Sequence, residues 1–491
     1  MMTKMNVHAT SPASREPVPH ILERLGIAVG ALVNDSRKAV PGAVFAAYPG
    51  EARDGRDFIQ QAVAQRVDGV LWEADHWQWD PALNVPNAGV AGLKARVGEI
   101  AAHVYGEPSR ALHMVGVTGT NGKTSVAHWL AQAFTQLGRK TAVIGTVGNG
   151  FPDALTPALN TTPDAIELQQ RLADYRRQGA AVCAMEVSSH GLAQGRVNGT
   201  SFKVAVLTNL SRDHLDYHGD MDRYGAAKAQ LFDWPGLDWA VLNLDDAFGQ
   251  RLEAEKRPAQ IAGYGFRRGA VVAEALRLSQ AGLHLTVRSD WGNAEVEAPL
   301  LGRFNAANLL AVLTTLLVSG EKLDDACRAL AHITPPPGRM QMLGGDALPL
   351  VVVDYAHTPD ALEQVLATLR EIVGGGRLIC VFGCGGNRDR GKRPLMGQAA
   401  AKGADEIWLT SDNPRNEDPQ RILDDILAGM HGAPHVEADR ARAIFGAIGG
   451  ADHGDVVLIA GKGHEDYQEI AGERLPFSDV TVAKKALEAW R

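Results

Sequence analysis

Cysteine is scarce in this chain, and its spacing does not suggest a disulfide framework. The 491 residues include four cysteines, and no two of them form a Cys-x-x-Cys pair. Cys183 and Cys380 lie in short apolar runs. We therefore expect reduced thiols in a hydrophobic core, which suits a cytosolic protein.

Long apolar segments and an excess of positive charge are also missing. No apolar stretch approaches the length that spans a membrane. The first twenty residues are polar, with Pro and Ser, so we expect a disordered extension over residues 1–20 rather than a signal peptide. The net charge of −8 does not favour nucleic acid or an anionic membrane as a partner. The composition, 45% hydrophobic and 22% charged, is ordinary for a soluble enzyme.

What is present is an alternation of short apolar runs and helical patterns, which predicts an α/β fold of about three domains. We expect a smaller N-terminal α/β domain (21–108), a central domain with a mostly parallel sheet (109–333) and a C-terminal, Rossmann-like doubly wound domain (334–491). Three consecutive prolines within 334–338 mark the last boundary and a possible hinge region. The expected strands lie at 43–47, 69–72, 112–117, 143–145, 181–187, 204–208, 239–242, 350–353, 378–382, 406–410 and 456–460.

The most informative segment is 116–125, which reads GVTGTNGKTS. It follows an apolar run and precedes a helical pattern that stops at Gly138. Strand, glycine-rich turn, Gly-Lys-Thr and helix form the phosphate-cradling P-loop arrangement, although Val117 stands where the usual spacing has glycine. Lys123 would lie near the β/γ-phosphates, and Thr124 can offer its hydroxyl to Mg²⁺. The alternative is an ordinary glycine-rich turn.

Two further segments carry acidic and histidine side chains just past apolar strands. Glu186 ends one strand and is placed to hold Mg²⁺, as the acid of a Walker B strand does; the alternative is a solvated acid. Residues 208–219 hold two Asp, an Arg and two His, of which His214 could ligate a second metal ion. Lys228 follows nearby, and nothing in the local pattern singles it out.

The third block has polar loops after each strand. Residues 354–360 read DYAHTPD, and 383–393 combine glycines with four basic side chains, which suits an anion. Arg415 lies in a short loop before Asp418 and Pro419, which we predict to be a helix N-cap and its first residue. Its guanidinium could clamp a carboxylate. A last permissive loop, 461–465, contains Glu465.

Together these motifs resemble the Mur ligase family, the ATP-dependent ligases that build the peptidoglycan stem peptide. The resemblance runs from about residue 35 to the C-terminus. It rests on segments that read GTNGKT (119–124), EVSSH (186–190), TNLSRDHLD (208–216), GRFNAAN (302–308) and DYAH (354–357). DNPR at 412–415 matches the motif that selects meso-diaminopimelate; lysine-adding members lack the arginine, because lysine has no distal carboxylate.

The resemblance implies a role for each matching residue. The ATP positions are Gly119, Thr120, Asn121, Gly122, Lys123, Thr124, Ser125, Asn305, Arg339 and Asp354. The UDP-MurNAc-dipeptide positions are Asn34, Ser36, Glu51, Ala52, Arg53, Asn160, Thr161, Thr162, Ser188, Gln194 and Arg196. The meso-diaminopimelate positions are Arg388, Asp412, Asn413, Pro414, Arg415, Gly461 and Glu465. Lys228 matches a lysine that becomes carbamylated in this family. As an anionic carbamate it would face the metal ions together with Thr124, Glu186 and His214. The resemblance implies that the catalytic residues are Lys123, Glu186, His214 and Lys228.

The implied reaction is amide formation through an acyl phosphate, with ATP as substrate and Mg²⁺ as the metal. Its small-molecule substrates would be ATP, UDP-MurNAc-L-Ala-D-Glu and meso-diaminopimelate, and we expect a cytoplasmic monomer without membrane insertion. Two alternatives remain open. One is a related ligase that adds lysine or D-Ala-D-Ala, or a folylpolyglutamate synthetase. The other is a non-ligase P-loop ATPase.

Overall fold

The computed structural model describes residues 16–51, 53–255, 257–345 and 347–490. These residues form two compact units. One consists of Met1–Met114, Thr162–Ala181 and Val187–Phe202, and the other of Val115–Thr161, Val182–Glu186 and Lys203–Arg491. The domain boundaries expected at residues 108 and 333 stay predictions. No helix among the described residues is both long and apolar enough to cross a membrane.

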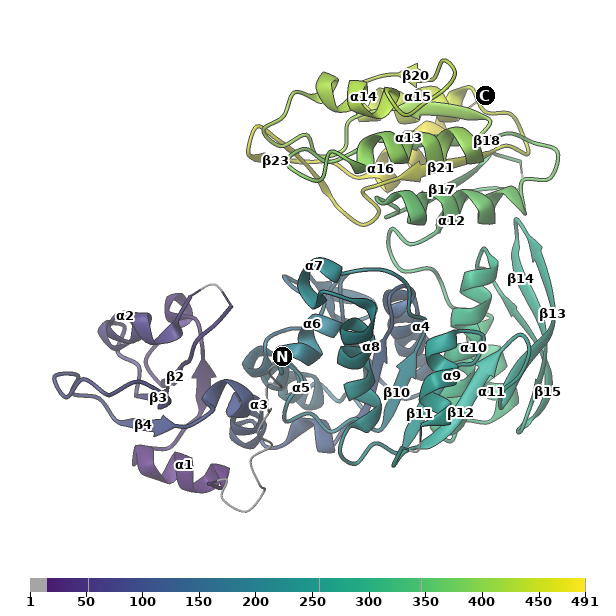
Figure 1. Ribbon diagram of the computed structural model, residues 1–491. Coiled ribbons are helices and arrows are strands. Elements are labelled where there is room, and N and C mark those ends of the chain that lie inside the picture. Colours follow the sequence, from purple (N-terminus) through teal and green to yellow (C-terminus); the bar gives the residue numbers. More distant parts are fainter. Residues whose placement is uncertain (1–15, 52, 256, 346, 491) are drawn as a thin grey trace, which may run out of the picture. The chain divides into compact units, whose positions relative to one another are not determined.

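The first unit holds a parallel sheet in the order β1-β2-β3-β4 (Figure 1). Its strands are β1 (Ala31–Val33), β2 (Ala43–Ala47), β3 (Gly69–Glu73) and β4 (Asn87–Val90). One face packs against α1 (Val18–Leu25) and α3 (Leu93–Val104), and the other against α2 (Ile59–Ala64). Helix α1 begins at Val18, inside the segment expected as an extension, and residues 1–15 lie outside the described residues. Helices α5 (Ala165–Arg177) and α6 (Ser189–Ala193) also belong to this unit.

The second unit holds an eleven-stranded sheet in the order β15-β14-β13-β12-β11-β10-β5-β9-β6-β7-β8. Its strands are β5 (His113–Thr118), β6 (Thr141–Ile144), β7 (Asn149–Phe151), β8 (Ala154–Thr156), β9 (Val182–Glu186), β10 (Val204–Leu207), β11 (Trp239–Asn243), β12 (Gln260–Gly265), β13 (Val271–Ser279), β14 (Gly282–Ser289) and β15 (Gly292–Ala298). The middle strands are parallel, whereas β14 pairs antiparallel with both β13 and β15, and β7 with both β6 and β8. The expected mostly parallel sheet is thus confirmed, with antiparallel additions at both edges.

Helices bury one face of this central sheet. Side chains of α4 (Lys123–Gln136), α10 (Arg303–Val318) and α11 (Leu323–Leu330) pack on apolar residues of β5, β6, β9, β10 and β11. The remaining helices of this part are α7 (Leu215–His218), α8 (Met221–Ala229) and α9 (Ala247–Ala254). Burial of both α4 and the β5 strand fixes the strand-turn-helix geometry that the P-loop sequence predicts.

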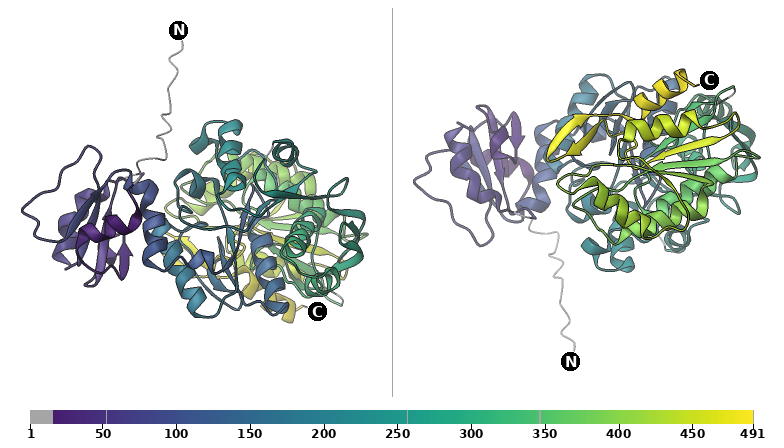
Figure 2. Two further views of the ribbon diagram at one scale, coloured as in Figure 1. Left: turned by 90° about the horizontal axis from the view of Figure 1, so that it is seen from below. Right: turned by 90° about the horizontal axis from the view of Figure 1, so that it is seen from above.

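A third sheet, in the order β16-β17-β21-β18-β19-β20, completes the second unit. Its strands are β16 (Gln341–Gly344), β17 (Leu350–Asp354), β18 (Leu378–Phe382), β19 (Glu406–Leu409), β20 (His435–Val436) and β21 (Val456–Ala460). Helices α12 (Pro359–Arg370), α13 (Lys392–Gly403) and α14 (Pro419–Leu427) cover one face, and α15 (Arg440–Gly449) and α16 (Asp479–Glu488) the other (Figure 2). This arrangement confirms the expected doubly wound domain.

Local sequence explains several element ends. Asp418 caps α14 by accepting a hydrogen bond from the backbone N–H of Gln420, and Pro419 is the first helical residue, as predicted. Helix α4 ends at the turn that Gly138 makes with φ +83°. The four cysteines are free thiols, and Cys183, Cys380 and Cys384 are buried. A two-stranded hairpin, β22 (Tyr467–Ile470) and β23 (Glu473–Pro476), follows the last strand of the third sheet.

Candidate active site

The loop between β5 and α4 has a backbone that only glycine fits well. Gly122 adopts φ +85° and Gly119 φ +148°, both in the region that favours glycine. A Cβ on Gly119 would lie 1.9 Å from Oγ1 of Thr208, which itself donates to the carbonyl of Asn121 at 2.6 Å. The loop is therefore pinned by the end of β10, and its backbone N–H groups precede the α4 N-terminus, as phosphate binding requires.

Lys123 lies folded against this loop. Its Nζ donates to the carbonyl oxygens of Gly119 (2.9 Å) and Thr120 (2.8 Å). Burial lowers the pKa of Lys123, while the charges of Glu186 and Asp213 act against that shift. The ammonium is thus held by two carbonyls at the position where a P-loop lysine meets phosphate oxygens.

Glu186 ends β9 and is buried next to Thr124. Thr124 Oγ1 donates to Glu186 Oε2 at 3.0 Å, and the backbone N–H of Thr146 donates to Oε1 at 2.7 Å. A Cβ on Gly145 would lie 2.2 Å from Glu186 Oε1, so the carboxylate needs a glycine beside it. The structure brings the predicted hydroxyl and carboxylate together.

These oxygens fit Mg²⁺ by chemistry, since a hydroxyl and a carboxylate are hard donors and Mg²⁺ usually takes one or two protein ligands plus phosphates and water. Among the described residues, no group of three or more His, Cys, Asp or Glu side chains is close enough to hold a metal ion. His214 has φ +52°, and its Nε2 is 3.4 Å from Asp213 Oδ2.

Lys228 is buried on α8 and reaches the same loop from another direction. Its Nζ donates to the carbonyl oxygen of Gly119 at 2.8 Å and lies 4.5 Å from the ring centroid of Tyr224. Burial, with the neighbouring charge of Lys123, lowers the pKa of Lys228 well below its ordinary value. Such a lysine favours the neutral amine, which is the form that can take up CO₂.

Sequence reasoning missed three side chains that support the loop. The hydroxyl oxygen of Tyr224 lies 3.2 Å from Thr120 Oγ1. Tyr224 precedes Lys228 by four residues, so both lie on one face of the helix, and this spacing could have revealed Tyr224. Asn209 Oδ1 accepts from the backbone N–H of Asn121 at 3.0 Å. The Thr146 hydroxyl donates to Glu186 Oε2 at 3.2 Å, but this residue lies in a segment without a sequence signal. Ser125 is buried in the first turn of α4.

Asn305 connects α10 to the P-loop. Its Nδ2 donates to the carbonyl of Leu301 at 2.9 Å, and its Oδ1 accepts from Asn308 at 3.4 Å. Asn308 in turn packs on the loop, since a Cβ on Gly122 would lie 2.5 Å from its Oδ1. Asn305 thus reaches the P-loop through Asn308, which makes the contact with Gly122.

Asp354 and Arg339 lie at the carboxyl end of β17. Asp354 accepts hydrogen bonds from the backbone N–H groups of Met340 and Ala356, both at 2.8 Å, and burial raises its pKa. The guanidinium of Arg339 lies 4.9 Å from the ring centroid of Tyr355. Its Nε is buried and has no hydrogen-bond partner among the described residues, as expected for a donor that serves a ligand.

The first unit contains a cavity of about 800 Å³. Predicted substrate residues supply much of its lining: Asn34, Ser36, Glu51, Arg53, Gln194 and Arg196. Tyr48 and Lys94, which the sequence did not reveal, also line it; Tyr48 accepts a hydrogen bond from Asn34 Nδ2 at 3.0 Å. Lys94 pairs with Glu51 at 2.9 Å. Ala52 lies outside the described residues.

The other predicted dipeptide residues fall into two groups. Thr162 and Ser188 are joined through their hydroxyls at 3.1 Å, and Arg196 donates to the carbonyl of Thr162 at 2.9 Å. These three belong to the first unit, with Gln194 accepting from Arg196 Nε at 2.8 Å. Thr161 belongs to the second unit, where its Oγ1 is 3.0 Å from that of Thr146, and the adjacent Asn160 is exposed.

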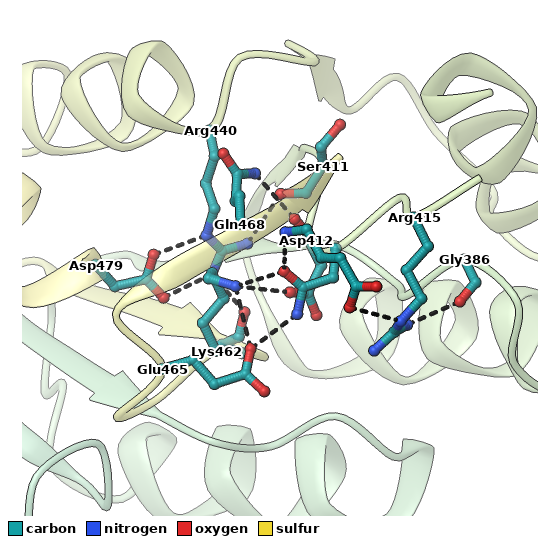
Figure 3. A network of polar contacts seen from close by, with 12 residues as sticks. Gly386, Ser411, Asp412, Arg415, Arg440, Lys462, Glu465, Gln468 and Asp479 are labelled. Carbon is teal, nitrogen blue, oxygen red and sulfur yellow. Dashed lines mark hydrogen bonds and ion pairs between the residues drawn. The ribbon is translucent and has the colours of Figure 1, made fainter. Parts of the chain in front are cut away.

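A polar network joins the loops after β19 and β21 (Figure 3). Asn413 Nδ2 donates to Glu465 Oε2 at 2.8 Å. Asp412 is buried, and Gly461, with φ +114°, lies beside it: a Cβ there would be 3.2 Å from Asp412 Oδ2. The structure therefore brings five of the seven residues predicted to hold the amino acid onto one edge of the sheet: Asp412, Asn413, Pro414, Gly461 and Glu465.

Arg415 is held at the rim of this network by residues the sequence did not single out. Its Nε donates to Glu469 Oε2 at 3.2 Å and its Nη1 to the carbonyl of Gly386 at 2.8 Å, whereas Nη2 has no partner among the described residues. Gly385 lies between the two predicted arginines: a Cβ there would be 3.0 Å from Arg415 Nη1 and 3.7 Å from Arg388 Cγ. Arg388 is exposed.

Comparisons with known proteins agree with this arrangement. Residues 117–316 match the Mur ligase middle domain, and residues 338–463 match the Mur ligase, glutamate ligase domain. The chain is 58% identical over 477 residues to the UDP-N-acetylmuramoyl-L-alanyl-D-glutamate--2,6-diaminopimelate ligase of Chromobacterium violaceum, covering 96% of this chain and 97% of that protein. The chain belongs to the Mur ligase family.

Two other Mur ligases extend this result. The enzyme of the same name from Nitrosomonas europaea is 50% identical over 507 residues, covering 98% of this chain and 97% of that protein. A solved structure of a UDP-N-acetylmuramoyl-L-alanyl-D-glutamate--2,6-diaminopimelate ligase superposes with a TM-score of 0.72 at 41% identity, covering 94% of this chain and 95% of that one. The match to the Mur ligase middle domain includes Lys123 and Glu186, and the match to the glutamate ligase domain includes Arg415.

Proposed function

We propose that this Mur ligase uses ATP to join meso-2,6-diaminopimelate to the D-Glu side-chain carboxylate of UDP-MurNAc-L-Ala-D-Glu, a step in making peptidoglycan precursors. Two relatives whose names state this activity are similar to the chain along nearly its whole length. Two side-chain atoms carry the choice of amino acid, one on Arg415 and one on Glu465. Arg415 Nη2 and Glu465 Oε1 have no hydrogen-bond partner among the described residues.

That pair complements the distal centre of meso-diaminopimelate. This centre is zwitterionic, with a carboxylate that an arginine can bind and an ammonium that a carboxylate oxygen can accept. Lysine offers the ammonium but no distal carboxylate, so Arg415 Nη2 would be left without an acceptor, while Nε and Nη1 keep Glu469 and Gly386. The geometry therefore favours meso-diaminopimelate over L-lysine.

The chemistry proceeds in two transfers. The D-Glu side-chain oxygen forms a bond to the γ-phosphorus of ATP as the bond to ADP breaks, which gives an acyl phosphate. The diaminopimelate amine then attacks the acyl carbon, loses a proton and expels inorganic phosphate, which leaves the amide. Lys123 and the P-loop N–H groups would bind and neutralise the phosphate charge during the first transfer.

The chain's own oxygens would hold Mg²⁺ beside these phosphates. Thr124 Oγ1 and Glu186 Oε2 are 3.0 Å apart and would be the first two oxygen ligands. We propose that Lys228, as a carbamate, and His214 complete the protein's share of the metal environment. Bound Mg²⁺ would offset the negative charge shared by phosphate and carboxylate.

The cavity in the first unit is proposed to bind the UDP-sugar part of the acceptor. Its volume of about 800 Å³ and its mixture of Asn, Ser, Arg and Lys side chains suit a nucleotide-sugar diphosphate. Arg37, Arg53 and Lys94 line its wall, where Arg37 pairs with Asp35 and Lys94 with Glu51. The first unit would then select the acceptor, while the second unit carries the nucleotide and amino-acid chemistry.

The test is phosphate release by the purified chain with ATP, Mg²⁺ and UDP-MurNAc-L-Ala-D-Glu, with meso-diaminopimelate or L-lysine added in parallel. We expect turnover and a product of tripeptide mass with meso-diaminopimelate only. Turnover with L-lysine alone would contradict the role given to Arg415. ATP hydrolysis that does not depend on the muramoyl substrate would place the chain among non-ligase P-loop ATPases.

We further propose that the enzyme acts in the cytoplasm as a monomer. Its substrates are soluble nucleotides and an amino acid. Sedimentation equilibrium of the full chain is expected to give the 52.4 kDa mass of one copy, and a concentration-independent mass of two copies would contradict the monomer.

A further inference from the structure

Lys462 is a fully buried lysine in the centre of the amino-acid network, two residues past β21 (Figure 3). Its Nζ lies 2.9 Å from Asn413 Oδ1, 3.1 Å from Glu465 Oε2 and 3.5 Å from Asp412 Oδ1. Each of these contacts is a residue predicted to hold the incoming amino acid. Because Lys462 has no exposed surface, a substrate atom cannot touch its ammonium, and it can act only through these neighbours.

The charges around Lys462 leave one carboxylate unmatched. Arg440 and Asp479 form a separate buried pair, with Nε–Oδ1 and Nη2–Oδ2 both at 2.7 Å. Asp412, Glu465 and Asp479 together carry −3, and Lys462 and Arg440 carry +2, so the sum is −1. One negative charge of this group therefore remains for a cation from outside to balance.

Of the two carboxylates beside Lys462, Glu465 is the more exposed, with 19% of its side chain accessible against 10% for Asp412, so it is the one that a ligand can reach. Its Oε2 accepts from both Asn413 Nδ2 and Lys462 Nζ, whereas Oε1 has no partner among the described residues. Glu465 is thus held by one oxygen and offers the other. An ammonium group that reaches Oε1 would complete the pairing.

Lys462 also fixes which way the Asn413 amide points. Asn413 Oδ1 accepts from Lys462 Nζ and, at 3.0 Å, from the backbone N–H of Glu469 in β22. With two donors on that oxygen, the amide nitrogen must face Glu465. A reversed amide would bring its own N–H groups against the Lys462 ammonium.

We propose that Lys462 is a positioning residue for amino-acid recognition. It orients Asn413 and Glu465 and balances Asp412, so that Glu465 Oε1 presents a single unmatched negative charge to the ammonium of the incoming amino acid. The inference rests on the proposed function, and it assigns to Lys462 a role in the binding of the amino acid and not in that of ATP.

The variant Lys462→Met removes the ammonium and keeps a side chain of similar length. We expect the KM for meso-diaminopimelate to rise at least about tenfold, while the KM values for ATP and UDP-MurNAc-L-Ala-D-Glu stay within about twofold. Lys402→Met is the matched control: Lys402 is exposed on α13, 3.8 Å from Glu363, and its loss should leave all three KM values unchanged.

A double variant separates positioning from simple structural support. Lys462→Met with Asp412→Asn removes one positive and one negative charge and restores the sum of −1, so part of the lost affinity for meso-diaminopimelate should return. Equal losses for all three substrates, with a lower melting temperature and no recovery in the double variant, would overturn the proposal. An unchanged KM for meso-diaminopimelate in Lys462→Met would also overturn it, whereas a wild-type chain without ligase turnover would instead defeat the proposed function.

Discussion

Lys123 and Lys228 share one hydrogen-bond acceptor, the carbonyl oxygen of Gly119, at 2.9 and 2.8 Å. The two side chains come from different helices, α4 and α8, and meet at the same loop. Two ammonium groups on one carbonyl repel each other, so the arrangement favours a neutral amine on Lys228, which is 1% exposed and has a pKa well below its ordinary value. Lys123 thereby prepares its neighbour for a reaction that requires the unprotonated form.

The first prediction is that Lys228 takes up CO₂. The neutral amine would form a carbamate, and Lys228→Met should lower ligase activity by about 10- to 100-fold by removing an oxygen donor near the metal. ¹³C NMR of the protein in ¹³C-bicarbonate is expected to show a carbamate signal in the wild type and none in the variant. A wild-type spectrum without that signal would count against the modification.

The lowered pKa of Lys228 also gives a pH dependence of stability. Between the lowered value and the ordinary value of 10.5, the unfolded chain binds one proton more than the folded chain. The contribution of this group to the free energy of unfolding therefore rises with pH in that window. In CO₂-free buffer, urea denaturation of Lys228→Met should lack that part of the slope, and an identical slope in both proteins would contradict the assignment.

Glu186→Gln should weaken the use of Mg²⁺. The amide keeps the shape of the side chain but loses the charge beside Thr124, so the Mg²⁺ concentration for half-maximal activity should rise, by about 10- to 100-fold. Metal titrations of phosphate release measure this. Glu253→Gln is a suitable control, because Glu253 pairs with Arg268 on the surface of α9, away from this loop; a similar shift in the control would show a nonspecific effect.

Gly119→Ala and Gly138→Ala form a matched test of the P-loop backbone. Both glycines have positive φ, which costs an alanine about 1–2 kcal/mol. A Cβ at Gly138 meets no atom within 4 Å, whereas at Gly119 it meets Thr208 Oγ1 at 1.9 Å. Calorimetric titration with an ATP analogue should therefore show binding in Gly138→Ala and none in Gly119→Ala. Retained affinity in Gly119→Ala would refute the phosphate-binding role.

Arg415→Met should change amino-acid selection. Loss of a hydrogen bond to a charged group costs about 1.5–3 kcal/mol, which is roughly a 10- to 100-fold rise in KM for meso-diaminopimelate. Discrimination against L-lysine should fall with it, as competition assays would show. Arg421→Met, on the exposed face of α14, serves as the control and should leave selection as it is.

The sequence predicts the parallel parts of the fold well because buried parallel strands read as continuous apolar runs. The run at 204–207 is an example, since all four residues are buried. Strands β13 and β15 were not foreseen: only the first three residues of β13 are buried, β15 has just two buried residues, and each strand contains two charged side chains. The hairpin β22–β23 has no fully buried residue, so its sequence has no hydrophobic pattern that would predict it.

Some residues of the candidate site can also be predicted from the sequence, whereas others emerge only from the structure. Lys123, Thr124 and Glu186 could be proposed from the sequence because glycine spacing and strand ends are visible there, and the structure places Thr124 against Glu186. Lys462 lies inside a segment that sequence analysis had already singled out, yet a lysine is usually exposed, and nothing in the sequence shows that this one is fully buried. Burial and side-chain direction depend on tertiary packing, so supporting residues of this kind emerge only from the structure.

The buried pair of Arg440 and Asp479 makes the end of the chain indispensable to the amino-acid site. Arg440 Nη2 also donates to the carbonyl of Ala460, just before Gly461, and Asp479 is the first residue of α16. Deleting α16 would leave an uncompensated guanidinium beneath the turn that carries Lys462 and Glu465, a defect that typically costs about 3–5 kcal/mol. A chain shortened from its C-terminal side should therefore keep all of α16.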